Sequence, residues 1–265
     1  MSALRIPMYQ VDAFAGRVFS GNPAAICPLE TWLPDAQMQS IAAENNLAET
    51  AFFVRNGVGY KLRWFTPVME VDLCGHATLA TAFVILNDLT PGERSVSFET
   101  KSGTLTVTRD GDLYSLDFPS RPPEPCNDAY PGLIPALGGK PEAVLAARDY
   151  LVVYGSEDEL GSLRPDMSAL MNIDRFAVIA TAPGREADFV SRFFAPAKGV
   201  PEDAVTGSAH CTLIPYWSKR LGKQKLHAFQ VSPRGGELWC ENRGARVTIS
   251  GKAARFFEGT IFLEA

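Results

Sequence analysis

The chain has 265 residues, of which 46% are hydrophobic and 21% are charged, and 25 basic against 30 acidic residues give a formal net charge of −5. This is the composition of a globular protein of about two domains, and without a basic run it excludes a general binder of nucleic acid or anionic membranes. No apolar stretch is long enough to cross a bilayer and no apolar secretion signal opens the sequence, so a cytoplasmic protein is expected.

The cysteines and histidines point away from disulfides and metals. Five cysteines are scattered without a Cys-x-x-Cys motif, which argues against both a disulfide framework and a structural zinc site. With three histidines in the chain, no metal site is expected. No phosphate-binding loop or nucleotide fingerprint occurs, so no cofactor is expected either.

The first half of the chain reads as mixed α and β structure. Helical spacing over 35–45 places Met38, Ile41 and Ala42 on one face. Apolar runs separated by turn residues predict strands at 8–14, 24–27, 51–54, 61–65, 96–100, 104–108 and 114–118. The second half repeats the theme, with predicted strands at 150–153, 176–180, 189–193, 228–231, 237–241 and 246–249.

One helix in each half, predicted over 75–86 and 207–221, is apolar nearly all round. Such a helix is normally enclosed, and a curved sheet wrapped around it would enclose it. Both helices begin with glycine, so their first N–H groups are unobstructed and, with the helix dipole, could bind a carboxylate. If the halves are related by a pseudo-twofold axis, both helix starts would face one cleft. The alternative is that these glycines only permit tight turns.

The sequence contains an internal repeat. Arg63-Trp-Phe-Thr-Pro67 recurs as Arg192-Phe-Phe-Ala-Pro196, and Cys74-Gly-His-Ala77 matches Thr206-Gly-Ser-Ala209. The second copy carries three extra residues between these motifs. A proline-rich linker at 119–125 then separates two predicted domains, 1–121 and 122–265, and the last strand could pack back on the first half.

Four side chains could carry chemistry. Glu49 lies between a predicted helix and an apolar strand, where apolar surroundings raise the pKa of a carboxyl group toward values useful for acid–base catalysis. A solvated loop acid is the alternative. His76 could be a buried structural histidine, and Asp203 could cap the helix that follows it. Cys74, just before a helix, could be reactive or could simply pack.

The remaining candidates have simpler explanations. His210 and His227 have no partner at motif spacing and are interpreted as structural or surface residues. The segment 234–237 is interpreted as a hairpin turn. Asn22 belongs to a Gly-Asn-Pro turn.

Four ordered strings resemble the PhzF-like (phenazine biosynthesis) isomerase family. They are Asp12-Ala-Phe…Phe19-Ser-Gly-Asn-Pro-Ala-Ala25, Asn46-Leu-Ala-Glu-Thr50, Asp72-Leu-Cys-Gly-His-Ala-Thr78 and Glu202-Asp-Ala-Val-Thr-Gly-Ser-Ala209. The resemblance runs from about Met8 to the C-terminus. It implies the diaminopimelate epimerase-like fold: an α+β protein of two pseudo-symmetric domains, each a curved mixed or antiparallel β-sheet wrapped around a central α-helix.

The resemblance also assigns roles to individual residues. The acid–base glutamate of the family falls on Glu49, its active-site histidine on His76 and its aspartate on Asp203. Substrate-binding positions fall on four further residues, which are Gly75, Gly207, Ser208 and, near the cleft, Asn22.

Two-thiol relatives such as diaminopimelate epimerase and proline racemase place a cysteine at each helix start. Cys74 occupies the first position, but Thr206 occupies the second, and a threonine hydroxyl has no accessible anion near neutral pH. A symmetrical two-cysteine racemase is therefore not expected, although a single thiol could act with another base.

The sequence predicts a cofactor-independent isomerase that moves a proton on a small carboxylate substrate, as a homodimer that binds neither nucleic acid nor membrane. Glu49 would move the proton while His76 and Asp203 orient the substrate, and Gly75, Gly207 and Ser208 would hold its anionic group. Three alternatives stay open. They are an epimerase or racemase using Cys74, an isomerase of the phenazine pathway itself, and a non-catalytic binding protein.

Overall fold

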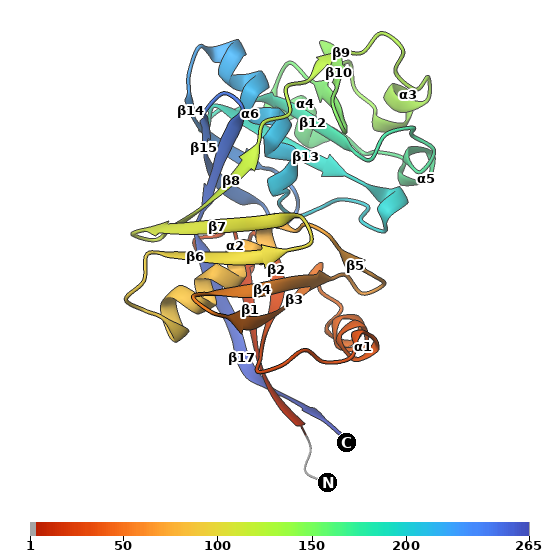
Figure 1. Cartoon of the computed structure of the whole chain (residues 1–265). Helices are drawn as coiled ribbons and strands as arrows, with labels where there is room; N and C mark the ends of the chain where they lie inside the picture. Colours follow the sequence, from red (N-terminus) through yellow and green to blue (C-terminus); the bar gives the residue numbers. More distant parts are fainter. Residues whose placement is uncertain (1–3, 265) are drawn as a thin grey trace. The chain divides into compact units, whose positions relative to one another are not determined.

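The computed structural model describes residues 4–264, which form two compact units (Figure 1). Unit 1 runs from the start of the described chain to Asp117 and also contains the described residues from Ser250 on, whereas unit 2 is Phe118–Ile249. The domain ranges 1–121 and 122–265 stay a prediction, because compactness alone does not show where an independently folding domain begins.

Unit 1 contains two principal helices. α1 (Asp35–Asn45) coincides with the predicted helix and buries the predicted face. α2 (Gly75–Val84) is shorter than predicted and continues as a π-helix, η1 (Ile85–Leu89), in which Thr90 N–H donates to the Ile85 carbonyl. The strands are β1 (Leu4–Ala13), β2 (Asn22–Leu29), β3 (Glu49–Asn56), β4 (Gly59–Phe65), β5 (Glu70–Val71), β6 (Ser95–Thr100), β7 (Gly103–Asp110), β8 (Leu113–Pro119) and β17 (Ala253–Leu263).

Unit 2 has one long helix, α6 (Gly207–Leu221), which coincides with the predicted helix and ends at Gly222 in the left-handed conformation. The proline-rich segment forms a two-residue strand, β9 (Glu124–Pro125), against β10. The other elements are α3 (Leu133–Leu137), β10 (Ala143–Ala146), β11 (Tyr150–Val153), α4 (Glu157–Ser162), α5 (Met167–Leu170), β12 (Val178–Pro183), β13 (Phe189–Phe194), η2 (Pro196–Lys198), β14 (Lys225–Gln230), β15 (Gly236–Asn242) and β16 (Arg246–Gly251).

Most predicted strands differ from the observed ones by a few residues at their ends. The strand predicted at 8–14 starts earlier and excludes Phe14, whose φ of 59° takes the chain out of the sheet. The strand predicted at 176–180 is shifted to β12, which runs from Val178 to Pro183, because a continuous apolar run obscures where the strand begins. The strand predicted at 228–231 is observed as β14, which begins three residues earlier and ends one residue sooner.

The two units share one strand topology, which confirms the duplication predicted from the repeat. In unit 1 the pairs β1–β2, β2–β3, β3–β4, β4–β6 and β6–β7 alternate between antiparallel and parallel. In unit 2 the pairs β10–β11, β11–β12, β12–β13, β13–β14 and β14–β15 alternate in the same order. Each parallel pair needs a crossover. The second crossover of each unit contains its long helix.

Both long helices are enclosed by their own unit, as their all-round apolarity predicts. α2 contacts β1, β2, β3, β7 and β17, and most of its residues are at least nine-tenths buried. α6 contacts β14 and β15, and its Trp217 stacks on Phe189 of β13 with the ring centroids 5.6 Å apart. The predicted α+β fold of sheets wrapped around central helices is confirmed.

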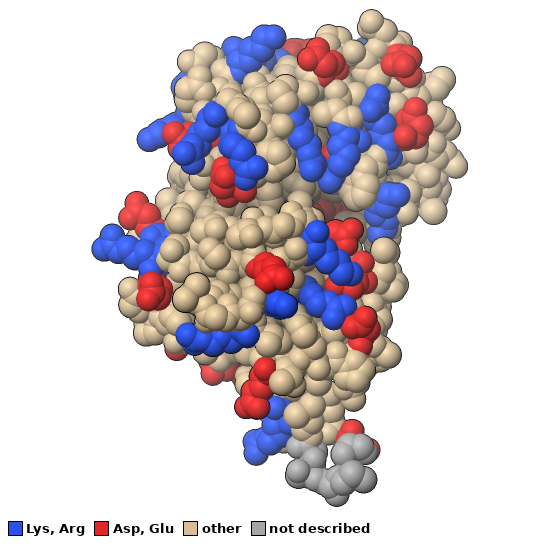
Figure 2. All heavy atoms as spheres, viewed as in Figure 1, with Lys and Arg blue, Asp and Glu red and all other residues tan. Residues whose placement is uncertain are grey.

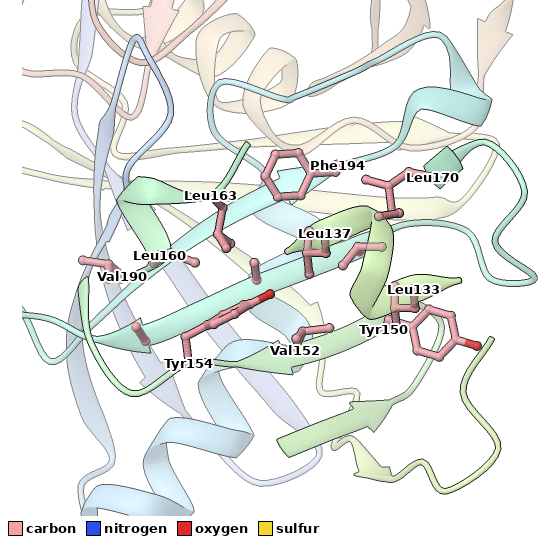
Figure 3. Close-up of a cluster of buried hydrophobic side chains, with 14 of the residues drawn as sticks. Leu133, Leu137, Tyr150, Val152, Tyr154, Leu160, Leu163, Leu170, Val190 and Phe194 are labelled. Carbon is pink, nitrogen blue, oxygen red and sulfur yellow. The ribbon is translucent and has the colours of Figure 1, made fainter. Parts of the chain in front are cut away.

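A second apolar core lies beside α3 and α4 in unit 2 (Figure 3). Leu137 and Leu160 from these short helices pack with Val152 of β11 and with Val190 and Phe194 of β13. Since Phe189 of the same strand contacts α6, β13 is buried on both faces. All six of its residues are buried, as is typical of such a strand, although Ser191 and Arg192 interrupt its apolar sequence.

Acidic and basic side chains are interspersed over both units on the face drawn in Figure 2. This mixture agrees with the small net charge and the lack of a basic run. Among residues 4–264, no helix is long and apolar enough to cross a membrane.

Candidate active site

Glu49 lies where α1 gives way to β3, as the sequence predicts. α1 ends because Asn46 adopts the left-handed conformation, and its N–H donates to the Ala42 carbonyl. The chain then enters β3 at Glu49, which pairs with Ala24 of the parallel strand β2. The carboxylate side chain is 18% exposed, so it is neither a solvated loop acid nor sealed in the core.

The start of α2 leaves its backbone donors available. Cys74 precedes the helix in an extended conformation and does not cap it with its side chain. Thr78 Oγ1 donates instead to the Cys74 carbonyl at 2.5 Å, which fixes the residue before the helix. The N–H groups of Gly75 and His76 at the first turn point along the positive end of the helix dipole.

His76 is the centre of a compact polar group in unit 1. Its Nε2 lies 3.0 Å from Glu49 Oε2, although the N–H direction does not meet the geometry of a hydrogen bond. Its Nδ1 lies 3.2 Å from Asn22 Nδ2 and 3.6 Å from Cys74 Sγ. Three of the predicted site residues, Glu49, His76 and Asn22, are thus brought together through one imidazole.

The electrostatics of this group favour a charged imidazole. Burial by itself lowers the pKa of His76, but the negative charges that Cys74 and Glu49 can carry outweigh it and hold that pKa well above its ordinary value. Burial, assisted by the Glu49 carboxylate, raises the pKa of the Cys74 thiol. The pKa values of His76 and Cys74 are therefore both raised, and the charge of Glu49 acts in the same direction on each.

Asn22 is held in place by the loop between β1 and β2. Asp12, which is 2% exposed, accepts a hydrogen bond from Phe19 N–H at 2.9 Å across that loop. Phe19 and Gly21 both have φ near +67°, and at Gly21 a Cβ would lie 2.2 Å from the Ala13 carbonyl oxygen. Only Gly21 of the Gly-Asn-Pro segment lies in the turn, whereas Asn22 and Pro23 already pair with β1 as the first residues of β2, so the predicted turn is wrong for these two residues. At the start of β2, Asn22 reaches His76.

The same group has donor atoms that could hold a metal ion. One oxygen of Glu49, the sulfur of Cys74 and one ring nitrogen of His76 all lie within 4.8 Å of each other. Carboxylate, thiolate and imidazole are ligands that zinc accepts. The sequence does not predict this grouping, because its members come from two elements 25 residues apart.

In unit 2, Asp203 belongs to a network that ends at the start of α6. Thr206 Oγ1 donates to Asp203 Oδ2 at 2.5 Å, and Asp203 N–H donates to the Phe193 carbonyl. Gln230, which is fully buried, accepts from Thr206 N–H at 2.8 Å and donates to the Asp203 carbonyl at 2.8 Å. Thr206 is therefore a hydrogen-bond donor to the carboxylate, in contrast to the thiol found at the matched position of unit 1.

Gly207 and Ser208 open α6, and Thr206 does not cap this helix with its side chain. Ser208 Oγ accepts a hydrogen bond from Arg148 Nη2 at 3.3 Å. One turn further on, His210 Nδ1 lies 2.9 Å from the Thr206 carbonyl, at the position that Thr78 occupies in α2. His210 is structural, as predicted.

An arginine–glutamate ion pair, called a brace below, fixes the segment before each long helix. Arg63 Nε and Nη2 donate to the two oxygens of Glu70 at 2.7 and 2.9 Å, four residues before Cys74. Arg192 makes the same two contacts, at the same distances, with Glu202, four residues before Thr206. The arginine of the repeated sequence motif thus makes the same contact in both units. In unit 2 this contact fixes Glu202, which is the residue next to Asp203.

The other predicted positions are ordinary structure. His227 is partly exposed and its Nε2 lies 2.7 Å from Glu237. The segment 234–237 belongs to the hairpin between β14 and β15, with Gly235 at a φ of 66°.

Sequence reasoning missed Gln230, Asp12 and Arg148. Gln230 could have been recognised from the alternation along β14, because it lies on the buried face of the strand with Leu226 and Ala228. A polar side chain on that face needs a buried hydrogen-bond partner. The charged pair Arg148 and Asp149 directly before the apolar strand β11 could also have been recognised in the sequence. Nothing local marks the distant partners, which are Ser208 for Arg148 and Thr206 for Gln230.

Comparisons with known proteins identify the family of this chain. The sequence matches the family described as phenazine biosynthesis-like protein over residues 11–259. An uncharacterised isomerase of Pseudomonas aeruginosa is 52% identical over 261 residues, which is 98% of this chain and 100% of that protein. The crystal structure of a PhzF family protein from Enterococcus faecalis is 50% identical, with a TM-score of 0.96 over 98% of this chain and 100% of that one.

A more distant structure shares the fold alone. It is a hydroxyproline epimerase from Agrobacterium vitis, 10% identical, with a TM-score of 0.64 over 100% of this chain and 93% of that one. Together, the family match and the close relatives confirm the predicted family resemblance and the prediction of an enzyme of the isomerase class. The chain belongs to the phenazine biosynthesis-like (PhzF) family of isomerases.

Proposed function

We propose that this isomerase moves a proton on a small carboxylate-bearing substrate, with Glu49 as the acid–base residue and without a cofactor. The observation that carries the proposal is the contact of the partly exposed Glu49 carboxylate with the buried His76 imidazole, 3.0 Å apart at the start of α2. A carboxylate that can reach solvent on one side and a fixed cation on the other can take up a proton and return it.

The chemistry follows from this arrangement. Glu49 would remove a proton from a carbon next to an electron-withdrawing group and deliver it to another carbon of the same molecule. The electron pair left behind needs positive charge nearby, which the His76 imidazolium and the N–H groups of Gly75 and His76 supply. Because these donors are fixed by the fold, no reorganisation is needed when charge develops.

Asp203, Gly207 and Ser208 enter the proposal through the family resemblance. Asp203 would orient polar groups of the substrate and share proton transfers, while Gly207 and Ser208 would bind its anionic group. The network of Gln230 and Thr206 supports this role, because it holds Asp203 in one position. A homodimer and a cytoplasmic location stay predictions.

An epimerase or racemase that uses Cys74 is the second candidate. The 3.6 Å contact between Cys74 Sγ and His76 Nδ1 favours it, because an imidazole beside a thiol can accept its proton. The raised pKa of Cys74 and the threonine at position 206 argue for the carboxylate instead.

Exchange in D₂O tests the proposal on several classes of acid at once, so the natural substrate need not be identified first. The full-length protein is incubated with a panel of unsaturated, 2-amino and 2-hydroxy carboxylic acids, and ¹H NMR follows the loss of each C–H signal. We expect at least one acid to exchange, and Glu49→Gln to lower its exchange rate by roughly 10²–10⁴.

Glu44→Gln is the matched control, since Glu44 is an exposed carboxylate on α1 and its loss should leave exchange unchanged. Circular dichroism and unfolding in urea would check that both variants fold. Exchange by Glu49→Gln at the wild-type rate would refute the assignment of Glu49.

A further inference from the structure

The contact between Asn22 and His76 in unit 1 has a counterpart in unit 2. His76 and Ser208 are each the second residue of a long helix, α2 and α6. Asn22 reaches His76 from the hairpin β1–β2, and Arg148 reaches Ser208 from the matching hairpin β10–β11. The duplicated fold therefore places an arginine where unit 1 places a residue of the proposed active site.

Arg148 is held rigidly. Its Nε and Nη2 donate to Asp149, an aspartate only 1% exposed, at 3.1 and 3.0 Å. Its guanidinium carbon lies 4.3 Å from the ring centroid of Phe176, close enough for a cation–π contact. A third of the side chain stays exposed, and Nη1 forms no hydrogen bond with residues 4–264. The cation is thus oriented, with only Nη1 available to a ligand.

The surroundings of Arg148 carry an excess of positive charge. Arg121 lies near enough to act on the pKa of Asp149, and its own Nη1 is buried without a hydrogen-bond partner in the described chain. Lys198 Nζ also lies 5.4 Å from the Phe176 ring. One buried aspartate therefore faces two arginines, and Lys198 adds a further positive charge nearby.

We infer that Arg148 and Ser208 form the subsite that binds the carboxylate of the substrate, an inference that rests on the proposed function. Ser208 Oγ accepts from Arg148, so its own proton is free to donate to a carboxylate oxygen. The N–H groups of Arg148 Nη1 can donate charge-assisted hydrogen bonds to a carboxylate oxygen, while Nε and Nη2 stay bonded to Asp149 and Ser208. The subsite selects for anionic acids over their amides, because an amide would leave the cation unpaired.

Isothermal titration of the full-length protein tests the subsite with succinate and benzoate at constant ionic strength. Their neutral amides, succinamide and benzamide, are the ligand controls. We expect at least one of the two acids to bind saturably to the wild type and its amide not to bind. Arg148→Gln should raise the dissociation constant roughly 10- to 100-fold, the loss of one or two hydrogen bonds to a charged group.

Arg185→Gln is the matched control, because it removes an exposed arginine of the same unit and should leave binding unchanged. Arg148→Lys keeps the charge but loses the planar fork, so its affinity should fall between those of the wild type and Arg148→Gln. If Arg148→Gln alone does not fold, the double variant Arg148→Gln/Asp149→Asn removes both charges of the pair and serves instead.

The outcomes separate this inference from the proposed function. Glu49→Gln should bind the acid like the wild type while it loses exchange in D₂O. No saturable binding by the wild type, or equal binding by Arg148→Gln and Arg185→Gln, would overturn the subsite even if exchange occurs. Loss of binding in Arg148→Gln, without exchange of any acid by the wild type, would support the subsite and refute the proposed function.

Discussion

Two buried histidines near the starts of the long helices respond to their surroundings in opposite ways. His76 lies between Cys74 and Glu49, and its pKa is raised. His210 donates from Nδ1 to the Thr206 carbonyl, and its Nε2 is buried without a partner in the described chain. Burial therefore lowers the pKa of His210 to about 4. The ionisable groups Cys74 and Glu49 lie beside His76, whereas for His210 only the hydrogen bond to the Thr206 carbonyl opposes burial, and this difference sets the direction of each pKa shift.

The raised pKa of His76 predicts a dependence of stability on pH. In the unfolded chain a histidine has a pKa near 6.5, so His76 should stabilise the fold fully below about pH 6.5 and lose that contribution as pH rises through its raised pKa. His76→Gln, which cannot titrate, should destabilise the protein more at pH 6 than at pH 9. Urea unfolding across this range measures the difference.

His210→Asn is the control, because asparagine can still donate to the Thr206 carbonyl. The folded pKa of about 4 lies below the unfolded value, so wild-type His210 removes stability as pH falls from about 6.5 to 4. His210→Asn should therefore lessen acid destabilisation. An identical pH response of both variants would contradict the assignment of opposite shifts.

Cys74 is expected to be dispensable for catalysis. Its thiol stays protonated at neutral pH because burial raises its pKa, and Thr206 leaves it without a partner thiol. Cys74→Ala should keep most of the D₂O exchange and cost about 1 kcal/mol of stability from lost packing. Inactivation with the fold intact would instead favour the thiol-based epimerase.

Among the elements, each long helix is preceded by a segment braced by an arginine and a glutamate. Arg192 is the more deeply buried of the two arginines, and it also donates to the carbonyls of Leu160 and Leu163. Arg63 shares its charge between Glu70 and Asp35, and the Asp35 side chain is 75% exposed. The second brace is therefore the more costly one to break.

Arg192→Gln should lower the free energy of unfolding by about 3 kcal/mol, because it leaves Glu202 partly buried and unpaired. Arg63→Gln should cost less, and the exposed Arg185→Gln should change stability by no more than about 0.5 kcal/mol. Urea unfolding ranks the three variants. Equal losses for Arg192→Gln and Arg185→Gln would show that the brace does not stabilise unit 2.

For the molecule as a whole, the repeat predicts that each long helix binds an anion at its start. Crystals grown from sulfate should contain a sulfate, or ordered water, within hydrogen-bond reach of Gly75 and His76, and another within reach of Gly207 and Ser208. A crystal structure checks this directly. A cation in either place would contradict the binding roles assigned to these residues.

Local sequence is enough to specify most of the elements and the duplication. Helices 35–45 and 207–221 were predicted to the residue, because their period and their terminal glycine or asparagine are local signals. The repeat and the four motifs led to the family, the fold class and Glu49, His76 and Asn22 as members of one site. The end of α2 was missed, since a π-turn leaves no mark in an apolar run.

The bonding partners of these residues follow only from the folded arrangement of the chain. Arg148 and its hydrogen-bond partner Ser208 are 60 residues apart in the sequence, and Gln230 and Thr206 are 24 apart. No local sequence pattern predicts such pairs. The charge of His76 also depends on Glu49, which comes from another element. Hydrogen bonds and pKa values depend on which groups lie within a few ångströms in space, and the chain brings those groups together only after its strands have paired.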